Sequence, residues 1–183
     1  YRTVLLVGVE IQSTGLDVST EGRDMAVLFG DGAGAAVLGA TEDEDGGVLT
    51  TNLHCDGRFA EKLWIDASCS YRNPRITHED LDEGRHYPRM EGREVFRHAV
   101  TEMPAAVMEA LEVCGLGVED IDLLIAHQAN LRISEGVQKR LGLPSEKTFN
   151  NIQRYGNTTA ASIPIALAEA VDEGRLERGD LLA

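Results

Sequence analysis

Two short polar sequences in the second half of the chain carry residue types that could stabilise a developing negative charge. His127 directly follows an apolar run, Ile121–Ala126, that is typical of a buried strand. Further along, Asn157 precedes a run of small residues that predicts a helix. Catalytic groups of α/β proteins gather at the carboxyl ends of strands, and an imidazole and a carboxamide can both donate to an oxyanion. The alternatives are a structural histidine and an ordinary helix N-cap, which Asn serves well.

A glycine-rich segment, Gly30–Gly34, could cradle a phosphate. A phosphate loop needs a helix N-terminus behind it, whereas Ala35–Leu38 has the pattern of a strand. We therefore predict that the segment tightly connects two strands, Ala26–Phe29 and Ala35–Leu38, and that its glycines permit close backbone approach. A nucleotide-binding domain is the weaker alternative.

The cysteines indicate a reduced, cytoplasmic protein, because they are odd in number and form no Cys-x-x-Cys pair: Cys55, Cys69 and Cys114. A metal site built from His54, Cys55, His78 and His86 is conceivable, but no pair of these residues has the spacing of zinc ligands. We expect no metal.

Composition excludes several classes of protein. The 183 residues are 43% hydrophobic, which is ordinary for a folded domain and argues against intrinsic disorder. The net charge of −14 argues against binding to nucleic acid or to an anionic membrane surface. No uncharged stretch is long enough to cross a bilayer. Both ends of the chain lie at apolar runs, so we expect a truncated sequence.

The hydrophobic pattern predicts strands that alternate with helices, and therefore an α/β layered fold. Strands are expected over Val4–Ile11 and Val48–Leu53, with an acidic turn over Glu42–Gly47 before the second. A long helix should begin at Glu94 and be kinked at Pro104 unless the missing donor is tolerated there. Two further helices are expected over Asn130–Leu141 and Thr158–Val171. Residues 56–89 have no clean period and fit a surface loop or insertion.

Four motifs, in order, resemble β-ketoacyl-acyl-carrier-protein synthase III, the initiating condensing enzyme of bacterial fatty-acid synthesis. They are Phe29–Ala35, Met90–Phe96, His127–Arg132 and Tyr155–Ser162. The resemblance implies a thiolase-like layered αβαβα fold, present here in part. On this basis, residues 1–55 are the end of the N-terminal half of the fold, and residues 90–183 are most of its C-terminal half. Residues 56–89 are a connecting loop or an insertion between the two.

The resemblance also implies roles for individual residues. His127 and Asn157 match the catalytic His and Asn of the family. Residues matching the family's contacts to coenzyme A and its pantetheine arm are Arg23, Met90, Arg93, Phe96, Ala129 and Asn130. Residues matching its docking surface for acyl carrier protein are Gln128, Arg132, Lys139 and Arg140. The last three share one helix face by their spacing of seven and eight, which gives a basic patch for an acidic carrier.

The implied reaction joins an acyl-CoA starter, with acetyl-CoA the first candidate, to malonyl-carrier protein by decarboxylative Claisen condensation. The resemblance implies a cytoplasmic homodimer that needs no cofactor beyond its coenzyme A thioester substrate. The nucleophilic Cys of the family lies upstream of the strand that opens this chain, and none of the three cysteines here matches it. This segment alone is therefore expected to be inactive.

Two alternatives stay open. One is a thiolase-fold synthase of secondary metabolism that uses another starter. The other is a non-catalytic, thiolase-like scaffold subunit, which would have no need of the His127–Asn157 pair.

Overall fold

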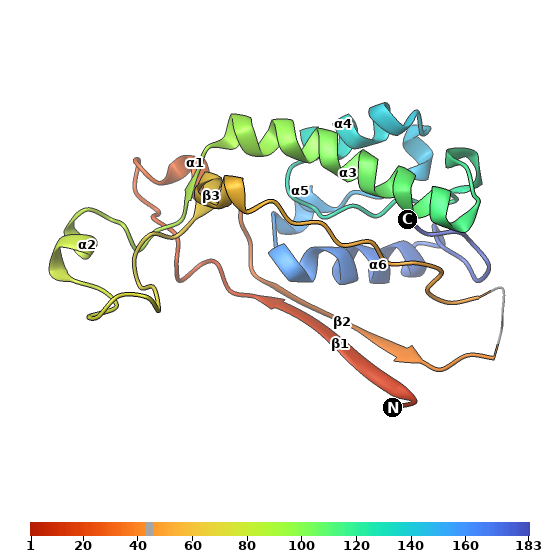
Figure 1. Ribbon diagram of the computed structural model, residues 1–183, viewed down its shortest axis with the longest axis horizontal. Coiled ribbons are helices and arrows are strands. Elements are labelled where there is room, and N and C mark those ends of the chain that lie inside the picture. The colour runs from red at the N-terminus through yellow and green to blue at the C-terminus, as the bar shows by residue number, and fades with distance from the viewer. Residues whose placement is uncertain (43–45) are drawn as a thin grey trace.

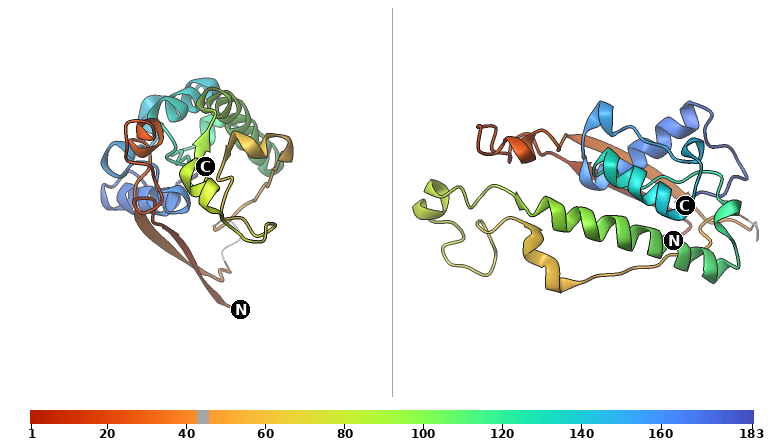
Figure 2. Two further views of the ribbon diagram at one scale, coloured as in Figure 1. Left: turned by 90° about the vertical axis from the view of Figure 1, so that its left-hand side faces the viewer. Right: turned by 90° about the horizontal axis from the view of Figure 1, so that it is seen from above.

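The computed structural model describes residues 1–42 and 46–183 (Figure 1). The middle of the expected acidic turn, Asp43–Asp45, lies outside the described residues. Three helices, α3, α4 and α6, surround short extended segments, and a two-stranded hairpin extends below α6 to the N-terminus (Figure 1). A lobe around the short helix α2 lies at one end of the molecule (Figures 1 and 2).

The hairpin consists of β1 (Thr3–Glu10) and β2 (Gly32–Gly39), paired antiparallel from Thr3 opposite Gly39 to Glu10 opposite Gly32. The strands expected over Val4–Ile11 and Ala35–Leu38 are thus confirmed. The predicted role of the glycine segment as a strand-to-strand connection was wrong, because β2 already begins at Gly32. No helix follows the glycines, so the helix N-terminus that a phosphate loop requires is missing from this segment.

The strand expected over Ala26–Phe29 is also wrong. Ala26 ends a short helix, α1 (Arg23–Ala26), and only Phe29 forms a bridge. The pattern misled because an apolar run of four residues suits a helical turn as well as a strand. The strand paired with β2 is β1, so the chain that connects β1 to β2, including Ala26–Phe29, only has to reverse direction and does not need a strand of its own.

One face of the hairpin is built for close contact. Side chains alternate between the faces of a strand, so Gly8 shares a face with the cross-strand Gly34. A Cβ at Gly8 would lie 2.3 Å from the carbonyl oxygen of Ala160, and one at Gly34 would lie 2.9 Å from the Pro164 side chain. The prediction that glycines here permit close backbone approach is confirmed. Several apolar side chains of β1 are more than half exposed, among them Leu5, Leu6 and Val7.

The main core lies between α3 (Gly92–Cys114) and α4 (Leu131–Leu141). Pro104 is buried inside α3, which continues through it. Asn130 caps α4, its side-chain oxygen accepting from the Arg132 amide at 2.9 Å. Both helices end at a glycine in the left-handed region. Buried members of this core include Leu111, Ile121, Leu124, Ile133, Val137 and Leu141.

The expected buried strand over Ile121–Ala126 is an extended, buried segment with parallel bridges on both sides. Leu123 pairs with Leu182, and Leu124 pairs with Thr148. Short 3₁₀ turns, η2 (Val118–Asp120) and η3 (Ser145–Lys147), precede two of these segments. The second core cluster lies on this layer and includes Leu123, Ile125, Phe149, Ala166 and Ala170.

The layer is covered by α6 (Ser162–Asp172), which begins four residues later than the sequence predicts. Between α5 (Ile152–Tyr155) and α6, the chain forms a 3₁₀ turn, η4 (Thr159–Ala161). Thr159 has a φ of 44°, in the left-handed region, so the α-helix cannot extend back through it.

Residues 56–89 hold short elements: η1 (Gly57–Lys62), β3 (Leu63–Trp64), α2 (His78–Asp82) and β4 (Arg89–Met90). Strands β3 and β4 pair antiparallel and close the segment into a lobe. Polar contacts hold the lobe together. The buried Asp80 accepts from Arg72 at 3.1 Å and from Arg85 at 3.4 Å, and its partner in the capping box of α2 is Thr77. The domain division at this lobe remains a prediction.

The strand expected over Val48–Leu53 is wrong, because this segment makes no strand pairing. It is tied instead to α3, where Glu109 accepts from the Asn52 side chain at 2.8 Å and contacts His54 at 2.7 Å. No helix in the described parts of the chain is long and apolar enough to cross a membrane.

Replacing Val137 with alanine should lower the free energy of unfolding by about 2 kcal/mol, because two buried methyl groups are lost between α3 and α4. Val137 is 1% exposed, whereas Val113 on α3 is 64% exposed and provides the matched control. Both exchanges gain the same helix propensity, so their difference isolates burial. Urea unfolding that gives equal losses for Val137→Ala and Val113→Ala would contradict the assigned core.

Candidate active site around His127 and Asn157

The backbone of Asn157 is fixed against the glycine segment of the first half. Its amide donates to the carbonyl of Leu28 at 2.7 Å, and its carbonyl accepts from the amide of Gly30 at 3.0 Å. A Cβ at Gly30 would lie 2.0 Å from the carbonyl oxygen of Tyr155, so a glycine is required there. Two motifs far apart in sequence, Phe29–Ala35 and Tyr155–Ser162, are thus brought together.

The side chain of Asn157 has a defined orientation. It is 8% exposed, and its Oδ1 accepts from the Thr159 amide at 2.9 Å. Asn157 does not cap α6 directly, since α6 begins at Ser162. Because the oxygen is engaged with a backbone donor, the Nδ2 group is the part of the side chain that can donate to a ligand.

The side chain of His127 is held by the first residue of α6. Its Nδ1 lies 2.6 Å from the Oγ of Ser162, and the same Oγ accepts from the Gln128 amide at 3.4 Å. The Ser162 hydroxyl is placed to donate to Nδ1. With that donation, the neutral His127 ring carries its hydrogen on Nε2.

Burial lowers the pKa of His127 below its ordinary value of 6.5, since desolvation disfavours the charged imidazolium. At neutral pH the ring is therefore uncharged. Both His127 and Asn157 are tied to one short stretch, residues 157–162, and each keeps a neutral N–H donor. Such a pair can stabilise negative charge that develops on a carbonyl or thioester oxygen.

Gln128 is 0% exposed, and this corrects its expected place on the docking surface. Its amide group donates to the carbonyl of Ala126 at 2.8 Å, and its oxygen accepts from the Asn151 amide at 3.0 Å. A side chain without exposed area cannot contact a partner. Gln128 instead ties the chain before His127 to the segment that leads to Asn157.

The remaining residues of the expected docking face lie on α4. Arg132, Lys139 and Arg140 are all exposed. Arg140 leans towards α3, its guanidinium lying 3.4 Å from the carbonyl oxygen of Val100. Ala129 and Asn130 lie between His127 and α4, where Asn130 serves as the helix cap.

The other four residues expected to contact coenzyme A are distributed over three elements. Arg23 begins α1, Met90 ends β4, and Arg93 and Phe96 lie in the first turns of α3. Arg23 and Arg93 are exposed, and Phe96 is partly so. Their role in binding stays a prediction.

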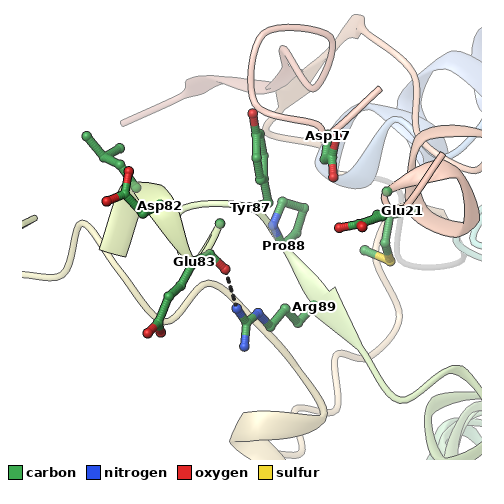
Figure 3. Close-up of a pocket in the computed structure, with 11 residues that line it drawn as sticks. Asp17, Glu21, Asp82, Glu83, Tyr87, Pro88 and Arg89 are labelled. Atoms are coloured by element: carbon green, nitrogen blue, oxygen red, sulfur yellow. Dashed lines mark hydrogen bonds between the residues drawn. The ribbon is translucent and has the colours of Figure 1, made fainter. Parts of the chain in front are cut away.

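A pocket of about 400 Å³ lies close to two of these elements but is a different feature (Figure 3). Arg89 is one of its lining residues and donates to the carbonyl oxygen of Glu83 at 3.2 Å. Carboxylates line it from both sides: Asp17, Glu21, Asp82 and Glu83. Neither His127 nor Asn157 is among its lining residues, and its acidic lining does not suit the phosphates of coenzyme A.

Two side chains of the conceivable metal site have other partners. His54 contacts Glu109 of α3, and the His86 ring lies against the Tyr87 ring at a centroid distance of 4.0 Å, tilted by 38°. Within residues 1–42 and 46–183, no cluster of three or more His, Cys, Asp or Glu side chains is placed to hold a metal ion.

Sequence reasoning missed Ser162 as a partner of His127. The available signal was its position inside the motif Tyr155–Ser162, at the start of a helix. Thr159 and its contact to the hairpin, described below, gave no signal in the sequence.

Comparison with known proteins places this arrangement in a family. Residues 1–57 match the model of 3-oxoacyl-[acyl-carrier-protein (ACP)] synthase III, and residues 111–183 match the model of its C-terminal part. The β-ketoacyl-[acyl-carrier-protein] synthase III of Roseiflexus castenholzii is 49% identical over 179 residues, which are 98% of this chain and 53% of that protein. The enzyme of Caldanaerobacter subterraneus is 46% identical over 182 residues, 100% of this chain and 54% of that protein.

Solved structures agree. The β-ketoacyl-[acyl-carrier-protein] synthase III of Thermus thermophilus has a TM-score of 0.86 at 44% identity, covering 99% of this chain and 54% of that chain. The corresponding synthase of Aquifex aeolicus has a TM-score of 0.84 at 42% identity, covering 99% and 52%. The chain belongs to the 3-oxoacyl-[acyl-carrier-protein] synthase III family and spans about half the length of the curated relatives it matches. The expected partial thiolase-like α/β fold is confirmed.

The His127 pKa should lie below 6.5 in the folded, full-length protein, and NMR titration of its ring signals measures it. The pKa of His127 in the folded protein lies below its value of 6.5 in the unfolded chain. At a pH between these two pKa values, the unfolded chain has bound the proton and the folded protein has not. The free energy of unfolding therefore falls as the pH falls through 6.5. Ser162→Ala removes the hydroxyl that donates to the neutral ring and should raise the pKa. A value at or above 6.5 in the unsubstituted protein would refute the neutral assignment.

Proposed function

We propose that the full-length protein containing this chain is a β-ketoacyl-[acyl-carrier-protein] synthase III that starts fatty-acid synthesis. It joins an acyl-CoA starter, with acetyl-CoA the first candidate, to malonyl-carrier protein with loss of carbon dioxide. The observation that carries the proposal is the pair of neutral donors, His127 Nε2–H and Asn157 Nδ2, held by one turn.

The chemistry explains why two neutral donors are needed. When the malonyl thioester loses carbon dioxide, electrons move onto the thioester oxygen and form an enolate. Donors aimed at that oxygen stabilise the transition state, each by about 3 kcal/mol when the geometry is right. The enolate carbon then attacks the acyl carbon on the enzyme, which restores the thioester carbonyl and forms the new carbon–carbon bond. The tetrahedral intermediate collapses as the acyl–sulfur bond breaks and the enzyme's cysteine leaves as a thiolate.

The acyl group is carried by a cysteine thiolate in this proposal. None of Cys55, Cys69 and Cys114 matches the family's nucleophile, and Cys114 lies at the end of α3, where the helix dipole opposes a thiolate. We infer that the nucleophile lies outside these 183 residues, so the segment alone is inactive in condensation. The full-length protein is proposed to act as a homodimer in the cytoplasm.

The binding roles follow the family resemblance. Coenzyme A and the pantetheine arm are proposed to contact Arg23, Met90, Arg93, Phe96, Ala129 and Asn130. The carrier protein is proposed to dock on the exposed basic side chains of α4, namely Arg132, Lys139 and Arg140. This gives an acidic partner a local positive surface on a chain whose net charge is −14.

A synthase of secondary metabolism is the second candidate. The priming β-ketosynthase of the R1128 polyketide biosynthetic pathway has a TM-score of 0.77 at 32% identity, covering 98% of this chain and 51% of that one. The higher identity to the β-ketoacyl synthases III favours fatty-acid synthesis. A non-catalytic scaffold is disfavoured, because it has no need of two oriented donors.

His127→Ala or Asn157→Ala in the full-length protein should lower the rate of malonyl-thioester decarboxylation by about 10²- to 10³-fold. Transfer of the acetyl group from acetyl-CoA to the enzyme should change little, since no enolate forms in that step. Release of labelled carbon dioxide measures the first step, and protein-bound label measures the second. Equal loss of both steps would mean that these residues support the fold.

Arg132→Glu combined with Lys139→Glu should raise the KM for malonyl-carrier protein several-fold, because reversed charge repels an acidic partner. The KM for malonyl-CoA, which does not use this surface, should stay unchanged. Arg178→Glu reverses an exposed charge beyond α6 and is the control. A similar rise for all three charge reversals, or none for the pair on α4, would contradict the docking surface.

A further inference from the structure

We propose that Glu10, at the end of β1, is a positioning residue that fixes the orientation of the Asn157 amide through Thr159. The inference rests on the proposed function. Thr159 donates two hydrogen bonds: its hydroxyl donates to Glu10 Oε2, and its amide donates to Asn157 Oδ1 at 2.9 Å. Glu10 thus reaches the site from a strand 149 residues away in sequence.

Thr159 needs an external partner because of its backbone conformation. Its φ of 44° lies in the left-handed region, which β-branched residues rarely adopt. In this turn the Thr159 amide donates to the Asn157 side chain. Such a conformation persists only where surrounding contacts stabilise it, and the hydrogen bond from the Thr159 hydroxyl to Glu10 is such a contact.

The hairpin places Glu10 where it can act. Gly8 and Glu10 lie two residues apart and therefore share a face of β1, opposite Gly34 and Gly32. Three of these four positions lack a side chain, and a Cβ at Gly32 would lie 3.0 Å from Thr158. The strand backbone consequently packs directly on the turn, and Glu10 is the one of the four with a side chain that can reach Thr159.

The consequence concerns which end of the Asn157 amide meets the substrate. With Oδ1 bonded to Thr159, the Nδ2 donors are left for the developing oxyanion. Without the hydrogen bond to Glu10, Thr159 can relax to a negative φ, and the hydrogen bond from its amide to Asn157 Oδ1 can break. The carboxamide is then free to turn its oxygen towards the oxyanion, which repels it.

The test is a set of variants in the full-length protein. Glu10→Ala should lower malonyl-thioester decarboxylation by about 10- to 100-fold and leave acetyl transfer from acetyl-CoA unchanged. Glu10→Gln keeps an acceptor oxygen and should retain most of the wild-type rate. Glu112→Ala, an exposed glutamate on α3, is the matched control and should have no effect.

A second variant removes the same hydrogen bond from its other end. Thr159→Val keeps the shape of the side chain without the hydroxyl and should lower decarboxylation as Glu10→Ala does. The double variant should lose no more than either single one, because both remove one interaction. This comparison remains decisive if Glu10→Ala folds poorly.

The outcomes separate this inference from the proposed function. Wild-type decarboxylation in Glu10→Ala and Thr159→Val, equal loss of decarboxylation and acetyl transfer, or multiplying losses in the double variant would each overturn the role of Glu10. If Asn157→Ala loses decarboxylation while these variants do not, the proposed function stands without it. If the wild-type protein does not decarboxylate a malonyl thioester, both fail.

Discussion

The close packing of the hairpin backbone on the turn at residues 157–162 is the constraint on which the candidate site depends. A Cβ at Gly8 would clash with the Ala160 carbonyl, one at Gly30 with the Tyr155 carbonyl and one at Gly34 with the Pro164 side chain, so only glycine permits the observed packing. The turn then holds Asn157 by its backbone and by its side-chain oxygen. The same turn ends at Ser162, which orients His127. The glycine segment Gly30–Gly34, whose composition could suit a phosphate loop, therefore connects the first part of the chain to the turn that carries Asn157.

The electrostatic character of the site follows from this packing. Burial disfavours the imidazolium form of His127, and a Ser162 hydroxyl that donates to Nδ1 leaves the ring hydrogen on Nε2. Two neutral donors suit an oxygen whose charge appears only during the reaction, since they cost no reorganisation when it develops. The pocket beside the lobe at residues 56–89 is lined by carboxylates, and neither His127 nor Asn157 is among its lining residues.

Helices with strong periodicity and capping signals were predictable from sequence, as Asn130–Leu141 shows. Short apolar runs were not: Ala26–Phe29 and Val48–Leu53 look like strands locally, but tertiary contacts direct them elsewhere. His127 and Asn157 could be singled out because their motif context is distinctive, and their catalytic role stays a prediction. The burial of Gln128 and the hydrogen bond between Glu10 and Thr159 could not be predicted, since both depend on contacts between residues far apart in sequence.

The most direct test of the account is a crystal structure of the full-length protein with a non-hydrolysable malonyl-pantetheine analogue. The account predicts that His127 Nε2 and Asn157 Nδ2 both lie 2.7–3.1 Å from the analogue's thioester-equivalent oxygen, the range expected of oxyanion donors. The Asn157 Oδ1 should still accept from Thr159. An oxygen held by other groups, or an Asn157 amide turned to present its oxygen, would contradict the central claim.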